Sequence, residues 1–183
     1  IVELSSAAFG QTNSLTPIEV CSGIAAVANG GTLLKPYVVS EIKDANGNTV
    51  SKTEKTEVRR VISEDTAQKV RSMMKGVVDE GTGKNGYVAG YNVAGKTGTS
   101  TKLAESTDGK TKYIVSFAAI APSDDPQIAM LIVCDEPNQD LGGGALCAPI
   151  AAQVIEQTMT ELNIEPRYTE SESKKLSIST PNT

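Results

Sequence analysis

The sequence contains no histidine and no tryptophan, and it has only five tyrosines and two phenylalanines among 183 residues. Without histidine, the chain itself can build neither a serine–histidine catalytic pair nor a histidine metal site. Its packing must rely on aliphatic side chains and methionine. Hydrophobic residues make up 39% of a chain long enough to bury a core, so we expect one globular domain.

Basic clusters and long apolar runs are missing as well. The net charge is −5 at pH 7, and no run rich in lysine or arginine favours a nucleic-acid partner. The longest apolar run, residues 128–134, has the length of a strand, whereas a membrane span needs roughly 18 apolar residues. The chain opens on Ile1 in what reads as the middle of a domain. We therefore expect a piece of a longer or split polypeptide, in which case the lack of a signal peptide here says little about location.

Local signals predict two helices in the first half of the chain. The capping box at 16–19, with proline at the first helical position, begins one of them. Ser63 caps the second, predicted over about 64–79. The apolar stripe of this second helix includes Met73 and Met74, and we expect both methionines in the core.

Extended segments around the second helix predict strands. An Asn-Gly turn at 46–47 predicts a hairpin, and a tight turn at 123–126 makes the two strands around it antiparallel. A last helix is predicted over about 148–162. The polar, serine-rich residues 167–183 are expected to form a tail or linker after a domain of residues 1–166. The predicted strands are about 33–42, 48–51, 92–101, 113–122 and 127–135.

The stretch GYNVAGKTGTS at residues 90–100 admits two chemistries built around Lys96. Residues 90–97 match the phosphate-loop pattern G-x-x-x-x-G-K-[ST], which needs a buried strand before it and a helix opening at the lysine. Neither flank fits, because residues 80–89 contain three glycines and residues 98–101 have strand rather than helix character. We therefore interpret the phosphate-loop match as a chance one.

The same residues suit one wall of an acyl-transfer site on an edge strand. The Lys96 ammonium makes such a site positive and helps a neighbouring hydroxyl to lose its proton. The Thr97 hydroxyl can donate to a carboxylate, and Gly98 lets a ligand approach the backbone closely. A backbone N–H on such an edge can point at a developing oxyanion.

Short motifs along the chain, in a fixed order, carry a family resemblance. They are AFGQ (8–11), LTP (15–17), ANGG (28–31), KP (35–36), EGTG (80–83), VAGKTGTS (93–100), SF (116–117), AP (121–122), DEP (135–137), GG (142–143) and AP (148–149). Over about residues 1–166 the chain resembles the C-terminal half of a penicillin-binding protein transpeptidase domain of the high-molecular-weight class B type. K-T-G alone would be weak, and the ordered set is what makes the resemblance specific.

The resemblance implies a serine enzyme that cross-links peptidoglycan stem peptides. Its serine would attack a D-Ala-D-Ala carbonyl, and β-lactams would acylate the same serine. Lys96 would support proton transfer. The Lys96-Thr97-Gly98-Thr99 stretch would bind the substrate, with the Thr97 and Thr99 hydroxyls on its terminal carboxylate and the Thr99 N–H as one oxyanion-hole donor.

The resemblance also implies a fold, a location and partners. The expected fold is α+β, an antiparallel sheet with helices on both faces, here incomplete. The protein would act on the outer side of the cell membrane, with its anchor in the missing N-terminal part. Expected partners are the stem peptide, β-lactams, the missing half of the domain and a membrane glycosyltransferase, and no cofactor is expected.

The sequence departs from the family at the nucleophile. The family needs S-x-x-K, with serine as nucleophile, and then S-x-N. S-x-x-K strings begin at Ser40, Ser72 and Ser171, but each has the wrong context, and S-x-N is absent. The chain thus carries one wall of the site without the nucleophile. A D,D-carboxypeptidase and a non-catalytic β-lactam or peptidoglycan sensor module are the alternative functions.

Three cysteines remain to be interpreted. Their odd number and the lack of a C-x-x-C pair do not fit a disulfide framework. The predicted strand directions bring Cys134 to the same end of the sheet as Thr99, with Cys147 close by. We prefer two small buried side chains. A zinc site formed by Cys134 and Cys147 with Asp135 or with residues from the missing half stays open, and so does a disulfide. Cys21 is expected in the core.

Overall fold

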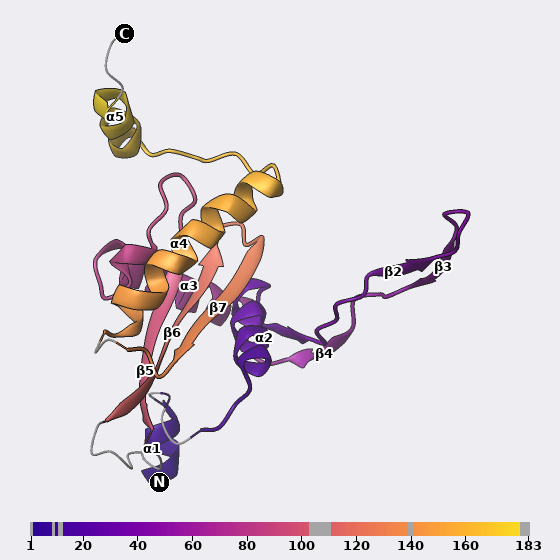
Figure 1. Cartoon of the computed structure of the whole chain (residues 1–183), viewed down its shortest axis with the longest axis horizontal. Helices are drawn as coiled ribbons and strands as arrows, with labels where there is room; N and C mark the ends of the chain where they lie inside the picture. The colour runs from indigo at the N-terminus through magenta and orange to yellow at the C-terminus, as the bar shows by residue number, and fades with distance from the viewer. Residues whose placement is uncertain (1, 9, 11–12, 103–110, 139–140, 180–183) are drawn as a thin grey trace.

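A three-stranded antiparallel sheet lies at the centre of the computed structural model, which describes residues 2–8, 10, 13–102, 111–138 and 141–179. The strands are β5 (Ala94–Lys102), β6 (Lys112–Ala121) and β7 (Ile128–Asp135), in the order β5-β6-β7 (Figure 1). All three were predicted to within about two residues, and both pairings are antiparallel. The tight turn at 123–126 therefore joins neighbouring strands, as expected.

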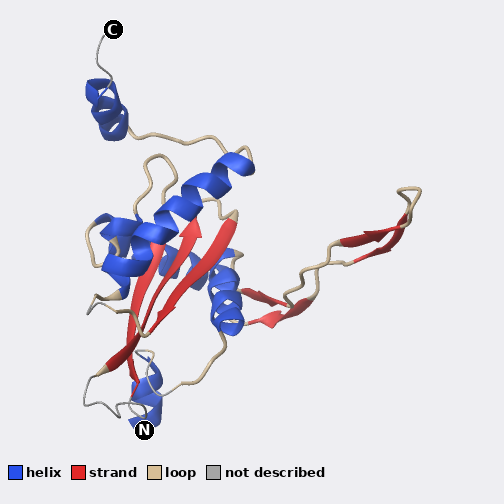
Figure 2. Ribbon diagram, viewed as in Figure 1, coloured by secondary structure: helices blue, strands red, loops and turns tan. Residues whose placement is uncertain are grey.

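The middle strand β6 is apolar on both faces because helices cover both sides of the sheet (Figure 2). Val115 and Phe117 point to one face and are buried in the larger of two core clusters. Ile120 points to the other face and packs in the smaller cluster. The predicted fold class, an α+β antiparallel sheet with helices on both faces, is confirmed.

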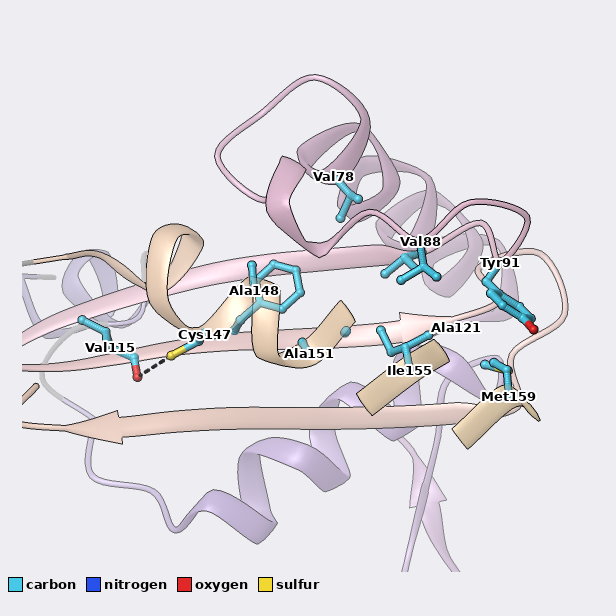
Figure 3. Packing of buried hydrophobic residues seen from close by; sticks show 13 residues of the cluster. Val78, Val88, Tyr91, Val115, Ala121, Cys147, Ala148, Ala151, Ile155 and Met159 are labelled. Carbon is cyan, nitrogen blue, oxygen red and sulfur yellow. Dashed lines mark hydrogen bonds between the residues drawn. The ribbon is translucent and has the colours of Figure 1, made fainter. Parts of the chain in front are cut away.

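The helix α4 (Gly143–Glu161) covers the first face of the sheet. Its buried residues include Cys147, Ile155 and Met159, which line up along the sheet with residues of β6 (Figure 3). The helix begins five residues before the predicted position at Ala148. The glycines at its first turn have poor helix propensity, and Pro149, which reads as a helix start, lies inside it.

Two helices cover the second face, α2 (Pro17–Ala28) and α3 (Glu64–Asp79). Both were predicted, and the Thr16 capping box and the Ser63 cap are present. Met74 is buried, but the side chain of Met73 is 71% exposed, so its expected place in the core is wrong. The buried stripe of α3 is formed by Ala67, Met74 and Val78. Because a helix turns about 100° per residue, Met73 lies to one side of this stripe and faces solvent.

The segment between α2 and α3 forms an arm that projects from the sheet (Figure 1). The predicted strand 33–42 is interrupted there, because Pro36 cannot donate to a strand ladder. The first part pairs with a strand that the sequence did not reveal, while the hairpin at the Asn-Gly turn is confirmed. The arm strands are β1 (Thr32–Leu34), β2 (Glu41–Lys43), β3 (Thr49–Lys52) and β4 (Glu57–Arg60).

The remaining elements are α1 (Val2–Ala8), the short 3-10 helix η1 (Lys84–Gly86) and α5 (Glu170–Ser179). The helix α5 lies within the segment 167–183 that was expected to be a tail or linker. Of that segment, residues 180–183 lie outside the described residues, as do Phe9 and Gln11 of the first motif. Across the described ranges, no helix is both long enough and apolar enough to cross a membrane.

Glu172 of α5 anchors the C-terminal segment to the loop after η1. One carboxylate oxygen accepts hydrogen bonds from the Tyr87 hydroxyl and, at 3.1 Å, from the Gly90 N–H. The other accepts from the Thr169 N–H at 2.6 Å and the Thr169 hydroxyl at 2.7 Å. These hydrogen bonds, the one from Tyr87 above all, lower the pKa of Glu172 to about 2. Burial first, and the hydrogen bond to Glu172 second, raise the pKa of Tyr87 to about 12.

The depressed pKa of Glu172 predicts an acid-sensitive contribution to stability. The ionised carboxylate stabilises the fold above its ordinary pKa of 4.5, and this contribution is lost as the pH falls towards about 2. The difference in free energy of unfolding between wild type and Glu172→Gln should therefore shrink between pH 5 and pH 2.5. Urea unfolding at several pH values measures it. Glu170→Gln, two residues away on the exposed start of α5, is the matched control for removing a carboxylate from this helix.

The buried face of α4 predicts a second stability effect. Ile155 is fully buried, so Ile155→Ala should lower the free energy of unfolding by about 2–5 kcal/mol through lost burial and a residual cavity. Val154, its neighbour on the same helix, is 39% exposed, and Val154→Ala should cost less than about 1 kcal/mol. Equal losses in chemical denaturation would contradict this packing of α4 on the sheet.

Candidate active site

The K-T-G motif lies on β5, at the edge of the central sheet. Lys96 and Thr97 are inside a nine-residue strand, and Gly90 lies in a turn with φ +78° rather than at the end of a buried strand. A phosphate loop needs a helix that begins at the lysine, and none begins here. The structure therefore confirms that the phosphate-loop match is a chance one and that this stretch is an edge strand.

The open edge of β5 exposes backbone groups of the motif. The Lys96 ammonium donates to the Thr97 carbonyl oxygen at 2.7 Å, so this carbonyl faces the edge that no described strand pairs. Backbone groups two residues apart on a strand point to the same side. The Thr99 N–H therefore points to the same open edge as the Lys96 ammonium.

The side chains of β5 alternate between the two faces of the sheet. Thr97 and Thr99 stand opposite Phe117 and Val115, on the face that α4 covers. Lys96 lies on the opposite face, as does Gly98, where a Cβ would lie 2.4 Å from the Ser116 hydroxyl. The strand thus presents two hydroxyls on one face, an ammonium on the other and backbone donors along the edge between them.

The loop after α3 supports the motif. The Thr82 hydroxyl lies 3.0 Å from the Thr97 hydroxyl, which joins the EGTG stretch at 80–83 to the K-T-G strand. The sequence indicated only a glycine loop at this point. A contact between residues fifteen positions apart leaves no periodic signal, so local patterns could not reveal Thr82 as a neighbour of the site.

The first turn of α4 forms the floor beneath the two threonines. A Cβ on Gly142 would lie 3.6 Å from the Thr99 hydroxyl oxygen, and one on Gly144 would lie 3.2 Å from the Thr97 methyl group. The N-terminal end of a helix carries partial positive charge, so α4 adds to the positive field of Lys96. Sequence reasoning missed this role because it placed these glycines in a loop before the helix.

Thr99 also lines a cleft of about 990 Å³, which lies at the end of the sheet where β5 ends and β6 begins. Two ion pairs involve its lining residues, because the Glu136 carboxylate lies 2.7 Å from the Lys102 ammonium and 3.1 Å from that of Lys112. Ser40, Ser72 and Ser171 are not among the lining residues, and the structure places them before β2, in the middle of α3 and in α5. The cleft is lined by Thr99, Thr111, Lys112, Tyr113, Val115, Glu136, Pro137, Asn138, Leu141 and Gly142.

Two of the cysteines lie beside this end of the sheet, as the strand directions predicted. Thr99, Val115 and Cys134 stand in one row across β5, β6 and β7. Cys147 is fully buried, and its thiol donates to the Val115 carbonyl oxygen at 3.5 Å. Burial, followed by the neighbouring Cys134, raises the pKa of the Cys147 thiol to about 11, which disfavours the thiolate that a metal needs.

The described residues hold no group of three or more histidine, cysteine, aspartate or glutamate side chains placed for a metal ion. Cys134 is half-buried and Cys147 buried, and no disulfide bond joins them in the structure. Cys21, on α2, is half-buried, and its thiol lies 3.8 Å from the Ala129 carbonyl oxygen of β7.

Comparison with known proteins agrees with this architecture. The family model described as penicillin binding protein transpeptidase domain matches residues 2–156. Stage V sporulation protein D of Bacillus subtilis is 39% identical over 94% of the chain, and a peptidoglycan D,D-transpeptidase FtsI homolog of Mesostigma viride is 35% identical over 90%. The chain belongs to the penicillin-binding protein transpeptidase family.

A solved structure supports the same assignment. Penicillin binding protein 3 of Mycobacterium tuberculosis, complexed with ampicillin, is 29% identical and superposes on 88% of the chain with a TM-score of 0.75. The chain spans only 27% and 30% of the two sequence relatives and 38% of this structure. The described fold is thus part of a transpeptidase domain.

The close approach of α4 to the sheet predicts opposite effects for the same substitution at two helical glycines. A Cβ on Gly143 would lie 2.0 Å from the Ser116 carbonyl oxygen and 2.8 Å from that of Gly98, so Gly143→Ala should destabilise the fold by at least about 1–3 kcal/mol. Gly76, inside α3, has nothing within 4 Å of its Cβ position. Gly76→Ala should therefore stabilise by about 0.4–1 kcal/mol. Thermal unfolding of both variants measures the difference, and a neutral Gly143→Ala would contradict this packing.

Proposed function

We propose that this chain supplies one wall of a serine peptidoglycan D,D-transpeptidase. The observation that carries the proposal is the K-T-G edge strand, with an ammonium, two hydroxyls and an outward N–H within four residues, in a member of the penicillin-binding family. The nucleophilic serine and its S-x-x-K lysine would come from the segment that the relatives have in addition. By itself the chain would be inactive.

Each group of the strand has a task in the proposed reaction. The serine oxygen attacks the carbonyl carbon of the penultimate D-Ala, and its proton passes through the lysines of the site to the departing D-Ala amine. The Thr99 N–H, at the open edge, stabilises the oxyanion that forms. The hydroxyls of Thr97 and Thr99, above the positive end of α4, hold the terminal carboxylate. An acceptor amine then attacks the acyl-enzyme and releases the serine.

The charges of the strand suit such a substrate. Lys96 would place an ammonium beside the position where negative charge develops, and its exposed side chain is free to face the missing half. β-Lactams carry a carboxylate next to a reactive carbonyl, so they would occupy the same positions and acylate the same serine. The complex of the mycobacterial relative with ampicillin supports this part of the proposal.

The location and further partners follow from the same proposal. Peptidoglycan lies outside the cytoplasmic membrane, so the site would face the outer side, held by an anchor in the N-terminal part of the whole protein. The glycan strands that it cross-links would come from a membrane glycosyltransferase. A D,D-carboxypeptidase would use the same site with water in place of the acceptor amine.

Labelling of the intact protein with a fluorescent penicillin tests the proposal. Lys96→Ala should slow acylation by roughly 10²–10⁴-fold, because it removes a group that supports proton transfer. Thr99→Val should slow acylation by roughly 10–100-fold, because a hydrogen bond to the carboxylate of the penicillin is lost. Thr101→Val, two positions along the same face of β5, serves as the matched control and should label at the wild-type rate.

Three outcomes separate the candidate functions. An intact wild-type protein that takes up no label, while correctly folded, would contradict the transpeptidase proposal. Labelling without turnover of a stem peptide would favour a sensor module. Release of D-Ala in water, with no cross-linked product when an acceptor amine is supplied, would favour the carboxypeptidase.

A further inference from the structure

The chain after α4 crosses the loop that leads into β5. We call residues 164–172 the strap. At one end of the crossing the Tyr91 hydroxyl donates to the Ile164 carbonyl oxygen at 3.2 Å. In the middle the Arg167 N–H donates to the Gly90 carbonyl oxygen at 2.7 Å. At the other end the Gly90 N–H donates to the Glu172 carboxylate at 3.1 Å. Both backbone groups of Gly90 are therefore bonded to the strap.

Gly90 is shaped for this contact. Its φ of +78° is in the left-handed region, which favours glycine. A Cβ at this position would lie 2.6 Å from the Pro166 side chain and 3.0 Å from the ring of Tyr168. The first glycine of the chance phosphate-loop pattern is thus the point where the strap lies against the loop.

A network of side chains extends the contact to the turn between β6 and β7. Arg167 forms an ion pair with Asp124 at 3.0 Å, and the Asn92 amide donates to the same carboxylate at 3.0 Å. The Ser123 N–H donates to the Asn92 carbonyl oxygen at 2.8 Å. The loop is held by the strap on one side and by the sheet on the other.

The loop continues directly into the K-T-G strand. Only residues 93–95 separate Asn92 from Lys96, and Val93 and Ala94 are almost fully buried. A short, buried connection of this kind transmits a shift of the loop to the strand, and a slip by one residue would move every side chain to the opposite face. The position of Lys96, Thr97 and Thr99 therefore depends on how the loop is held.

We propose that the strap holds β5 in its register and that Glu172 is a positioning residue for the acyl-transfer site. Glu172 touches neither the motif nor the cleft at Thr99, and it acts through Gly90. The positioning role rests on the proposed function, whereas the strap itself is a feature of the fold and can be tested without any activity.

The experiment uses the intact protein and two measurements. Hydrogen exchange at the Gly90 amide reports the strap, and the rate of acylation by a fluorescent penicillin reports the site. Glu172→Ala removes the carboxylate that accepts from Tyr87, Gly90 and Thr169, so exchange at Gly90 should become at least about tenfold faster. Acylation should become several-fold slower. Glu170→Ala, with an exposed carboxylate two residues away, should change neither measurement.

Two more variants separate positioning from a general loss of stability. Glu172→Gln keeps one oxygen that can accept from Gly90, so it should restore most of the acylation rate that Glu172→Ala loses. Arg60→Ala removes hydrogen bonds to the carbonyl oxygens of Gly30 and Ile62, far from the strap. It should lower the unfolding temperature but leave acylation unchanged at temperatures where the protein is folded.

The possible results are distinct. Unchanged exchange at Gly90 in Glu172→Ala would overturn the strap. Faster exchange with an unchanged acylation rate, or an equal slowing of acylation in Arg60→Ala, would overturn the positioning role. A wild-type protein that is not acylated at all would overturn the proposed function and the positioning role with it, and Gly90 exchange would still decide whether the strap exists.

Discussion

The position of the candidate site depends on how the backbone packs against the ring of Phe117. Phe117 is fully buried in the middle of β6, and three glycines surround its ring. A Cβ on Gly83, Gly86 or Gly95 would lie 3.1, 2.6 or 2.3 Å from ring atoms. Because these positions carry no side chain, the loop after α3, η1 and the start of β5 all converge on the ring. This convergence brings Thr82 to Thr97. The K-T-G strand itself lies at the edge of the sheet that no other described strand pairs.

Close packing also explains the two glycines, Gly90 and Gly95, that match the phosphate-loop pattern. Gly95 lies beneath the Phe117 ring, and Gly90 lies beneath Pro166 and Tyr168 of the strap. Both positions need glycine because another part of the chain occupies the space of a side chain. Neither has the helix N-terminus that would bind a phosphate. The spacing of the two glycines reflects two separate packing contacts rather than one binding loop.

The chemistry of the site comes from several elements that meet at one end of the sheet. β5 contributes an ammonium, hydroxyls and a backbone donor, and α4 contributes the positive end of its helix. The close approach of α4 is possible because Gly143 lies against the carbonyl oxygens of Ser116 and Gly98. Such an assembly gives the K-T-G motif its environment, and in the function we propose a serine from the rest of the domain completes it.

Local patterns were sufficient where the physical cause is local. The capping residues of α2 and α3 bond to amides within three residues, so the starts of both helices could be read directly. The turn at 123–126 likewise predicted that β6 and β7 are antiparallel.

Local patterns failed where contacts between distant residues decide the structure. Met73 and Met74 both fit the apolar stripe of α3, and only packing on the sheet separates them. The early start of α4 at three glycines, and the pairing of β1 with β4, have no local signal.

The sequence by itself determined the chemical groups of the candidate site and the strand that carries them. Lys96, Thr97, Gly98 and Thr99 could be placed on a strand because their propensities and flanks exclude a helix. The order of the strands in the folded sheet is what puts this strand at the edge. The tertiary structure alone decided what surrounds these groups: the Thr82 hydroxyl, the glycine floor of α4, the row from Thr99 to Cys134, and the strap on Gly90. The physical reason is that steric exclusion between residues far apart in the chain, such as Phe117 and Gly95, is invisible until the chain is folded.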